Sequence, residues 1–213
     1  TIVNLAEPGM GTVQYFARNK TDSLNLIKPD IVILQFGHIE QKEGTSTEVF
    51  ESNLAKIVDE IRGINAIPIL VTPVAIRIFD PSDNHINDLS GKRDSLLKVA
   101  RMKNTQIVDL NKDSAALYDR LGDRASTFMS VCGNECDDRS HFSLTGSYVI
   151  AALVAEKLPA ILQTFRTPLS ELIPTIEAAF ENDRRFSSLS IPFVELTGFQ
   201  DNVGSKGLFF SVQ

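Results

Sequence analysis

Many hydrophobic residues of this chain occur in four short runs. Two of these are almost wholly apolar, at residues 31–36 (IVILQF) and 67–71 (IPILV), and two include more polar residues, at residues 1–6 (TIVNLA) and 106–110 (QIVDL). Short apolar runs that are rich in β-branched residues and bounded by Pro, Gly or Asp are typical of strands buried on both faces. The pattern therefore predicts four strands.

Longer segments between and after these runs carry their apolar residues at helical spacing, so that one face of each segment would be buried. They lie at residues 47–62, 93–103, 112–121 and 145–162. Strands that alternate with helices predict an α/β fold, in which a parallel sheet is covered by helices on both faces.

A chain of 213 residues is long enough for one full domain of this class. We assign residues 1–165 to the α/β domain and residues 166–213 to an extension packed on the same domain. The extension is predicted to contain a helix at residues 168–183, followed by strand-like segments at residues 191–196 and 208–212.

Ligands of parallel α/β sheets bind beyond the carboxyl ends of the strands. The segments that follow the first three predicted strands are residues 7–11, 37–42 and 72–80. We expect the functional cleft to be built from these segments.

The overall charge and the length of the apolar runs indicate which classes of partner the protein does not bind. The formal net charge is −6, whereas binding to nucleic acid requires clustered Lys and Arg. No apolar run reaches the roughly 18 residues that cross a bilayer. These features predict a soluble protein with neither a nucleic-acid partner nor a membrane partner. Nothing in the sequence specifies an oligomeric state.

Histidine and cysteine do not suggest a metal centre. His38, His85 and His141 fall in separate predicted loops, without the spacing of a helical zinc site. Cys132 and Cys136 are the only cysteines, too few for a structural zinc set. No metal or cofactor is therefore predicted. The two cysteines could be reduced thiols or a short disulfide loop, and a disulfide would imply secretion.

The most distinctive local motif is Asp138-Arg-Ser-His141, which precedes an apolar helix. An Asp three residues before a His, at the start of a helix, can present both side chains to one cleft. In that arrangement His141 could act as a general base towards a serine hydroxyl, while Asp138 orients the ring. A loop histidine beside a helix-capping aspartate is the plainer alternative for so short a motif.

The neighbouring sequence resembles the SGNH (GDSL) hydrolase superfamily, in particular its rhamnogalacturonan acetylesterase-like branch. The matching blocks occur in the family's order within residues 1–163, at residues 4–12 (NLAEPGMGT), 35–42 (QFGHIEQK), 71–80 (VTPVAIRIFD), 107–122 (IVDLNKDSAALYDRLG) and 138–158 (DRSHFSLTGSYVIAALVAEKL). The resemblance implies a flavodoxin-like three-layer sandwich and a serine esterase lineage. Acetylated polysaccharide or another small ester is the implied substrate.

Carried over by position, the resemblance makes His141 the general base and Asp138 its orienting acid. Gly9 matches the glycine that donates a backbone N–H to the oxyanion hole, with Gly11 as the alternative. The remaining cleft residues implied by the resemblance are Gly37, His38, Glu40 and Arg77.

Two departures from the family pattern affect catalysis. The Gly-Asp-Ser block, which holds the nucleophile on the family's first strand, does not occur in this sequence. We therefore expect the first family strand to be absent from the fold. Ile39 stands where the family has an oxyanion asparagine, and isoleucine has no hydrogen-bond donor. Both departures predict impaired or absent hydrolysis.

Another part of the chain could compensate for these losses. Ser140 is too close to His141 in sequence to serve as its nucleophile. Ser205 could approach the cleft if residues 191–196 filled the place of the missing strand. The simpler expectation is that the C-terminal extension only covers the sheet at that position, because folded proteins protect exposed strand edges.

Three hypotheses follow. The first is a carbohydrate acetyl esterase-like protein that is impaired as given. The second is a pseudoenzyme that binds a glycan or a protein. The third is an unrelated α/β binding domain, although the sequence has no glycine-rich nucleotide-binding loop. The family resemblance and the close cysteine pair also lead us to expect a secreted protein.

Overall fold

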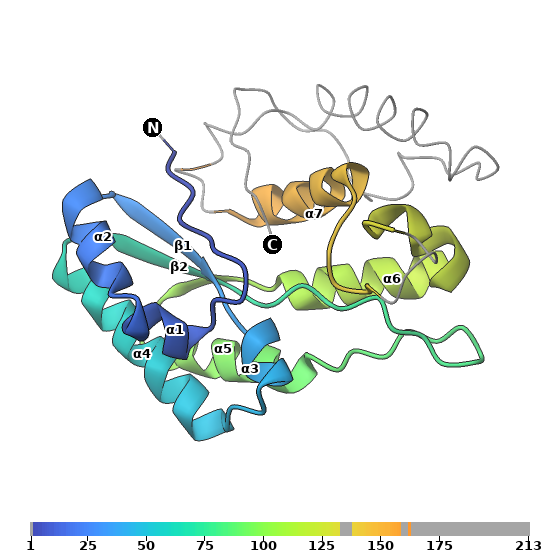
Figure 1. Cartoon of the computed structure of the whole chain (residues 1–213), viewed down its shortest axis with the longest axis horizontal. Coiled ribbons are helices and arrows are strands. Elements are labelled where there is room, and N and C mark those ends of the chain that lie inside the picture. The colour runs from blue at the N-terminus through green and yellow to red at the C-terminus, as the bar shows by residue number, and fades with distance from the viewer. Residues whose placement is uncertain (1, 133–137, 159–161, 163–213) are drawn as a thin grey trace. The chain divides into compact units, whose positions relative to one another are not determined.

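The computed structural model describes residues 2–132, 138–158 and 162, and it has an α/β fold (Figure 1). In chain order its elements are α1 (Thr12–Ala17), α2 (Lys20–Ile27), β1 (Ile31–Gln35), α3 (His38–Lys42), α4 (Thr47–Gly63), β2 (Ile67–Val71), α5 (Ser90–Met102), β3 (Gln106–Val108), α6 (Leu110–Ser126), the 3-10 helix η1 (Thr127–Met129) and α7 (Leu144–Lys157).

The three strands form one parallel sheet in the order β1-β2-β3. Ile31 pairs with Ile67 at the start of the first ladder, and Ile69 pairs with Gln106 in the second. Parallel neighbours need a crossover connection. Here α4 connects β1 to β2, and α5 connects β2 to β3. The carboxyl ends of all three strands consequently lie at one edge of the sheet.

The chain divides into two compact units. The first, which we call the sheet unit, comprises Glu7–Val74 and Asp88–Lys112. It holds the sheet and the helices α1 to α5. The second, which we call the helical unit, comprises residues 2–6, residues 75–87 and the described residues from 113 onward. It holds most of α6, together with η1 and α7.

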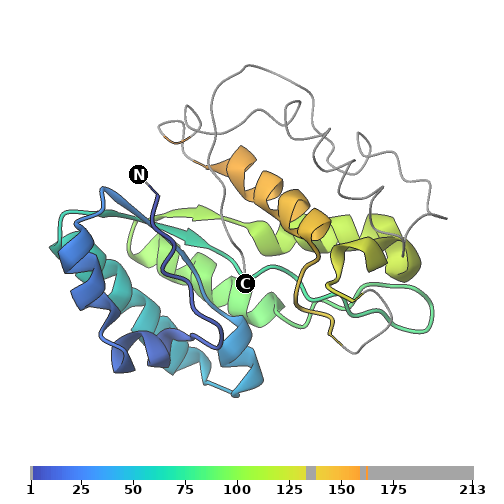
Figure 2. The same ribbon diagram turned by 45° about the horizontal axis from the view of Figure 1, so that its top comes forward.

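In the sheet unit, helices α4 and α5 lie side by side and pack against the strands (Figures 1 and 2). Helix α4 begins at its N-cap Ser46, whose hydroxyl accepts a hydrogen bond from the Val49 N–H at 3.3 Å. Its buried face is completely enclosed and consists of Phe50, Leu54, Ile57, Val58 and Ile61. These buried residues recur at the helical spacing that the sequence predicts for residues 47–62.

In the helical unit, α6 is interrupted at Gly122, whose φ of 70° and ψ of 174° lie outside the helical region. The chain then passes through η1 into the segment before α7. Helix α7 is apolar around much of its circumference, and Val149, Ile150 and Val154 are buried. A helix that is apolar on most sides needs burial on most sides.

Most of the predicted elements are confirmed, and two need correction. Residues 2–6 form no strand, although the sequence predicts one there. The side chain of Asn4 accepts a hydrogen bond from the Ala6 N–H at 3.0 Å, a local bond that competes with strand pairing. The strand predicted for residues 106–110 ends at Val108 because α6 already begins at Leu110.

Other predictions are not tested. The helix predicted for residues 168–183 and the strand-like segments at 191–196 and 208–212 lie outside the described residues, as does Ser205. The assignment of residues 1–165 and 166–213 to one domain and its extension stays a prediction. Among the described residues, no fourth strand joins the sheet.

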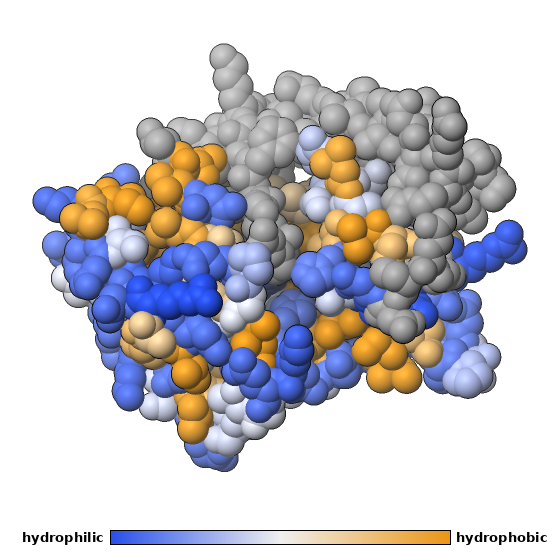
Figure 3. Space-filling model, in the orientation of Figure 1, coloured by the Kyte–Doolittle hydropathy of each residue, from blue (hydrophilic) through white to orange (hydrophobic). Residues whose placement is uncertain are grey.

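The surface is a mixture of polar and apolar groups on the face shown in Figure 3. Leu26 on α2 is 86% exposed, and Val13 on α1 is also exposed. None of the described helices combines the length and the apolar character needed to span a membrane.

Candidate active site

Asp138 and His141 form a directly bonded pair. The His141 Nδ1 lies 2.8 Å from the Asp138 Oδ2. A carboxylate can only accept a hydrogen bond, so Nδ1 carries the proton and the neutral ring keeps its lone pair on Nε2. The His141 side chain is 65% exposed and that of Asp138 is 30% exposed. The ring is therefore oriented from one side and accessible from outside.

Backbone N–H groups hold the Asp138 carboxylate in place. Its Oδ1 accepts hydrogen bonds from the backbone N–H groups of Ser140 at 3.1 Å and His141 at 2.9 Å. Partial burial opposes ionisation of Asp138. The N–H groups of His141 and Ser140 and the His141 ring outweigh that cost, and the pKa of Asp138 is lowered from its ordinary value. The pair thus combines an ionised carboxylate with an imidazole held in one tautomer.

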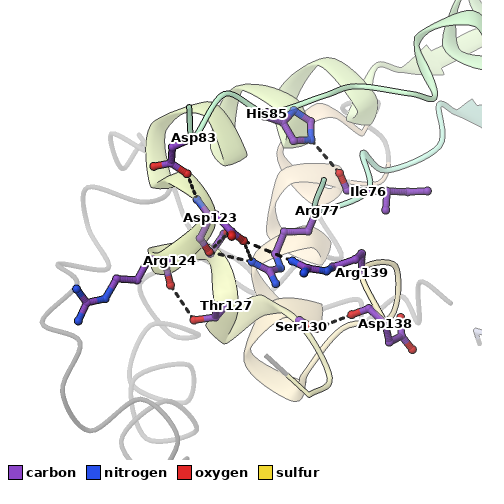
Figure 4. A network of polar contacts seen from close by, with 11 residues as sticks. Ile76, Arg77, Asp83, His85, Asp123, Arg124, Thr127, Ser130, Asp138 and Arg139 are labelled. Atoms are coloured by element: carbon purple, nitrogen blue, oxygen red, sulfur yellow. Dashed lines mark hydrogen bonds and ion pairs between the residues drawn. The ribbon is translucent and has the colours of Figure 1, made fainter. Parts of the chain in front are cut away.

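The segment that carries the pair is attached to the chain around η1. The Val131 N–H donates to the His141 carbonyl at 3.0 Å, and an antiparallel bridge joins Ser130 to Phe142. The Ser130 hydroxyl also donates to the Asp138 carbonyl at 3.0 Å (Figure 4). Both members of the pair are consequently anchored through their own backbone carbonyls.

The start of α7 strengthens this attachment. The Ser143 hydroxyl caps the helix by accepting from the Gly146 N–H at 3.0 Å, and it donates to the Phe128 carbonyl at 2.5 Å. Gly146 packs so tightly that a Cβ added there would lie 2.3 Å from the Met129 carbonyl oxygen. The segment after the Asp138–His141 pair is therefore held by a helix cap and by direct backbone packing.

The post-strand residues of the sheet unit form a second polar cluster. Gly37 follows β1 with a φ of 136°, and a Cβ there would lie 2.8 Å from the Pro73 ring. His38 begins α3, and its Nε2 lies 3.0 Å from the Val74 carbonyl. A carbonyl only accepts, so Nε2 carries the proton and donates. His38 is thus tied to the segment that follows β2.

Glu40 is the centre of this cluster. Its side chain is 1% exposed. Its two carboxylate oxygens accept hydrogen bonds from the Gly37 N–H at 2.9 Å and the Thr12 N–H at 2.5 Å. Glu40 therefore joins the start of α1 to the start of α3. The Gly37 N–H is already engaged in this bond and is not available to an oxyanion.

Gly9 and Arg77 are two further predicted cleft residues. Gly9 sits in a turn with a φ of 70°, closed by a 3.3 Å bond from the Met10 N–H to the Glu7 carbonyl. Arg77 is 1% exposed and forms an ion pair with Asp123. Burial lowers the pKa of the Arg77 guanidinium, and the Asp123 charge opposes this. The proposed roles of Gly9 and Arg77 in a cleft stay predictions.

The predicted site residues thus fall into two sets. The structure brings Asp138 and His141 together in the helical unit, and it brings Gly37, His38 and Glu40 together in the sheet unit.

Cys132 is disulfide-bonded, which favours a disulfide over reduced thiols for the cysteines. Cys136 lies outside the described residues.

Sequence comparison tests the family resemblance directly. No family model matches the chain. The chain is, however, 28% identical over 166 residues to the rhamnogalacturonan acetylesterase RhgT of Bacillus subtilis (strain 168), and this match covers 72% of each protein. It agrees with the ordered blocks of the sequence and with the directly bonded Asp-x-x-His pair. These findings support the assignment of the chain to the SGNH hydrolase superfamily.

Solved structures support the fold of this protein. The protein YxiM of Bacillus subtilis matches with a TM-score of 0.64 and 23% identity over 74% of this chain, but over only 45% of its own length. An acetylxylan esterase from Geobacillus stearothermophilus matches with a TM-score of 0.56 and 18% identity, covering 70% of this chain and 68% of its own. The shared fold is the flavodoxin-like α/β fold with a parallel sheet.

Sequence reasoning missed one feature of the candidate site. Asp123 receives ionic contacts from both Arg77 and Arg139, and Arg139 lies inside the Asp138-x-x-His141 motif (Figure 4). Asp123 is far from both arginines in sequence, and its helix gives no periodic signal for such a contact. The one local indication is Gly122, a helix-breaking residue that directly precedes Asp123 and follows the helix predicted for residues 112–121.

Proposed function

We propose that this SGNH protein is a carbohydrate acetyl esterase-like protein whose general base is His141, oriented by Asp138. The observation that carries the proposal is the 2.8 Å bond between the His141 Nδ1 and the Asp138 carboxylate, on an imidazole that is 65% exposed. Similarity to RhgT supports an acetylated polysaccharide of the rhamnogalacturonan type as substrate.

The chemistry assigned to the pair is proton transfer. The Nε2 of His141 takes the proton from an attacking hydroxyl as that oxygen bonds to the ester carbonyl carbon. Asp138 stabilises the resulting imidazolium, and His141 then returns the proton to the alcohol that leaves.

Hydrolysis by the 213 residues alone is expected to be weak. They contain no Gly-Asp-Ser nucleophile block, and Ile39 offers no donor at the asparagine position. Loss of one oxyanion donor costs on the order of 10²–10³ in rate. Without the serine, the pair can only activate water or another weak nucleophile.

Hydrolysis of p-nitrophenyl acetate tests this proposal. We expect slow turnover that is lost in His141→Gln and retained in the matched variant His85→Gln, because His85 lies outside the Asp138–His141 pair. A serine-reactive phosphonate should leave turnover unchanged and label no serine by mass spectrometry. Turnover that does not depend on His141 would exclude the esterase assignment. A labelled serine would exclude the proposed impairment.

Ile39 favours a second candidate function, in which the protein binds a glycan without hydrolysing it. An apolar side chain at an oxyanion position weakens catalysis but still allows contact with a sugar or an acetyl group. Calorimetric titration with acetylated rhamnogalacturonan oligosaccharide would detect such binding, with the deacetylated oligosaccharide as the matched ligand. Binding of neither ligand would exclude this function.

We also propose that the protein is secreted. The disulfide at Cys132 supports an oxidising compartment, because disulfides persist outside the reducing cytosol. Recovery of the protein from culture medium of its native host, with no free thiol at Cys132, is the expected result.

A further inference from the structure

Arg139, which lies inside the Asp138-x-x-His141 motif, contacts both Arg77 and Asp123. The Arg139 carbonyl accepts a hydrogen bond from the Arg77 N–H at 3.0 Å, and the Arg139 guanidinium lies 3.5 Å from an Asp123 carboxylate oxygen. Arg139 therefore has both its backbone and its side chain fixed. Because Arg139 directly follows Asp138, these contacts restrict the direction in which the Asp138 carboxylate points.

Asp123 binds Arg77 through both its backbone and its side chain. The Arg77 Nη1 donates to the Asp123 carbonyl at 2.8 Å and also to its carboxylate. Arg77 is 1% exposed, and a buried cation needs a paired anion. Figure 4 shows the two arginines converging on this one aspartate.

Asp123 is in turn held by a fixed backbone. It follows the break in α6 at Gly122, and its N–H donates to the Asp83 carboxylate at 2.6 Å. Its carbonyl also accepts from the Ser126 hydroxyl at 3.0 Å. The carboxylate that faces Arg77 and Arg139 is thus carried on a segment anchored at several points.

We propose that Asp123 is a positioning residue for the Asp138–His141 pair, acting through Arg77 and Arg139. It touches neither His141 nor any substrate. Its role is to hold the backbone of residue 139 so that the Asp138 carboxylate meets the His141 Nδ1. This inference rests on the proposed function of His141 as a general base.

The test is an NMR measurement of the two ring nitrogens of His141 in the folded protein, which needs no turnover. The resonances are assigned by their loss in His141→Gln. The Asp138 carboxylate holds the proton of the neutral ring on Nδ1, so loosening the pair should move part of that proton to Nε2. We expect Asp123→Asn and Arg139→Gln each to lower the fraction of the neutral ring that is protonated at Nδ1.

The two variants separate positioning from a direct effect of charge. They change the charge near His141 in opposite directions, because Asp123→Asn removes a negative charge and Arg139→Gln removes a positive one. Loosening of the motif lowers the Nδ1-protonated fraction in both. A raised or unchanged fraction in Arg139→Gln overturns the proposal. Arg139 is partly exposed, and its substitution leaves the Arg77–Asp123 pair intact, so this variant carries the test even if Asp123→Asn fails to fold.

Two further variants complete the experiment. Asp119→Asn makes the same chemical change at an exposed position of the same helix, and it should leave the Nδ1-protonated fraction of His141 unchanged. Asp138→Asn should lower this fraction the most, because it replaces the carboxylate that holds the tautomer. If it does not, the Asp138–His141 pair itself, and with it the proposed function, is excluded. If Asp138→Asn lowers the fraction and Arg139→Gln does not, only the positioning role of Asp123 is excluded.

Discussion

Glu40 and Asp138 are two of the carboxylates that hold backbone N–H groups, and they differ in what else they contact. Glu40 in the sheet unit is 1% exposed and accepts from Thr12 and Gly37, both through backbone donors. Asp138 in the helical unit accepts from two backbone donors through one oxygen and from the His141 ring through the other. The same chemical group thus joins two loops in one unit and orients a base in the other.

The difference shows that proximity to a family motif does not define a chemical role. Glu40 directly follows the position of the oxyanion residue, yet both of its oxygens are occupied by the backbone. Asp138 keeps one oxygen for a titratable partner. A carboxylate can take part in proton transfer only if it contacts a group that gains or loses a proton. By this criterion Asp138 qualifies and Glu40 does not.

The largest effect on stability is expected from Glu40→Gln. The amide nitrogen cannot accept a hydrogen bond, so the N–H of Thr12 or of Gly37 loses its buried partner. We expect a loss of about 2–3 kcal/mol in the free energy of unfolding, measured by urea denaturation. Glu43→Gln, an exposed change in the same segment, should cost less than about 0.5 kcal/mol. Equal losses in the two variants would show that Glu40 does not join the loops.

A smaller effect is expected from Gly146→Ala at the start of α7. The new methyl group would lie 2.3 Å from the Met129 carbonyl oxygen and must displace the helix or η1. We expect a net loss of about 1–2 kcal/mol, because strain exceeds the gain in helix propensity. The matched variant Gly91→Ala has open space around it in α5 and should be neutral or stabilising. Stabilisation by Gly146→Ala would contradict the close packing.

The smallest effect is expected from Asp138→Asn and should depend on pH. The pKa of Asp138 is lowered in the folded protein. Its ionised form therefore adds stability above the unfolded pKa of about 3.9, and this contribution is lost as the pH falls through the lower folded value. We expect Asp138→Asn to cost about 1 kcal/mol at pH 7 and less at about pH 3, by urea denaturation at each pH.

A control variant separates the contribution of the Asp138 carboxylate from that of the Ser140 hydroxyl, which makes a longer contact with it. Ser140→Ala removes only a 3.3 Å hydroxyl contact to Asp138, and it should change stability by less than about 0.5 kcal/mol at either pH. A penalty for Asp138→Asn that grows as the pH falls would contradict the lowered pKa.

The fold could be predicted where a segment is long or continuously apolar. Helix α4 follows directly from its helical periodicity, and strands β1 and β2 follow from their continuous apolar runs. The short helices α1, α2 and α3 have too few turns to show it, and the sequence did not indicate them. Residues 2–6 have a strand-like composition, but Asn4 uses its side chain to bond the local backbone.

The candidate site could be predicted only where its contacts are local. Asp138 and His141 are three positions apart, so their spacing implied a contact that the structure forms. Asp123 and Arg77 are 46 positions apart, with Asp88–Lys112 of the sheet unit between them, and no pattern in sequence connects them. Glu40 was placed in the cleft by resemblance, whereas its bond to Thr12 depends on how α1 meets α3.

The backbone of Gly37 has a consequence for how this sequence can vary. At a φ of 136°, with Pro73 where a side chain would begin, any replacement is both strained and obstructed. Gly9 has a φ of 70° and open space around it, a conformation that Asn and Asp also adopt. In a library of all single substitutions selected only for folding, codon 37 should remain glycine, whereas codon 9 should admit asparagine and aspartate.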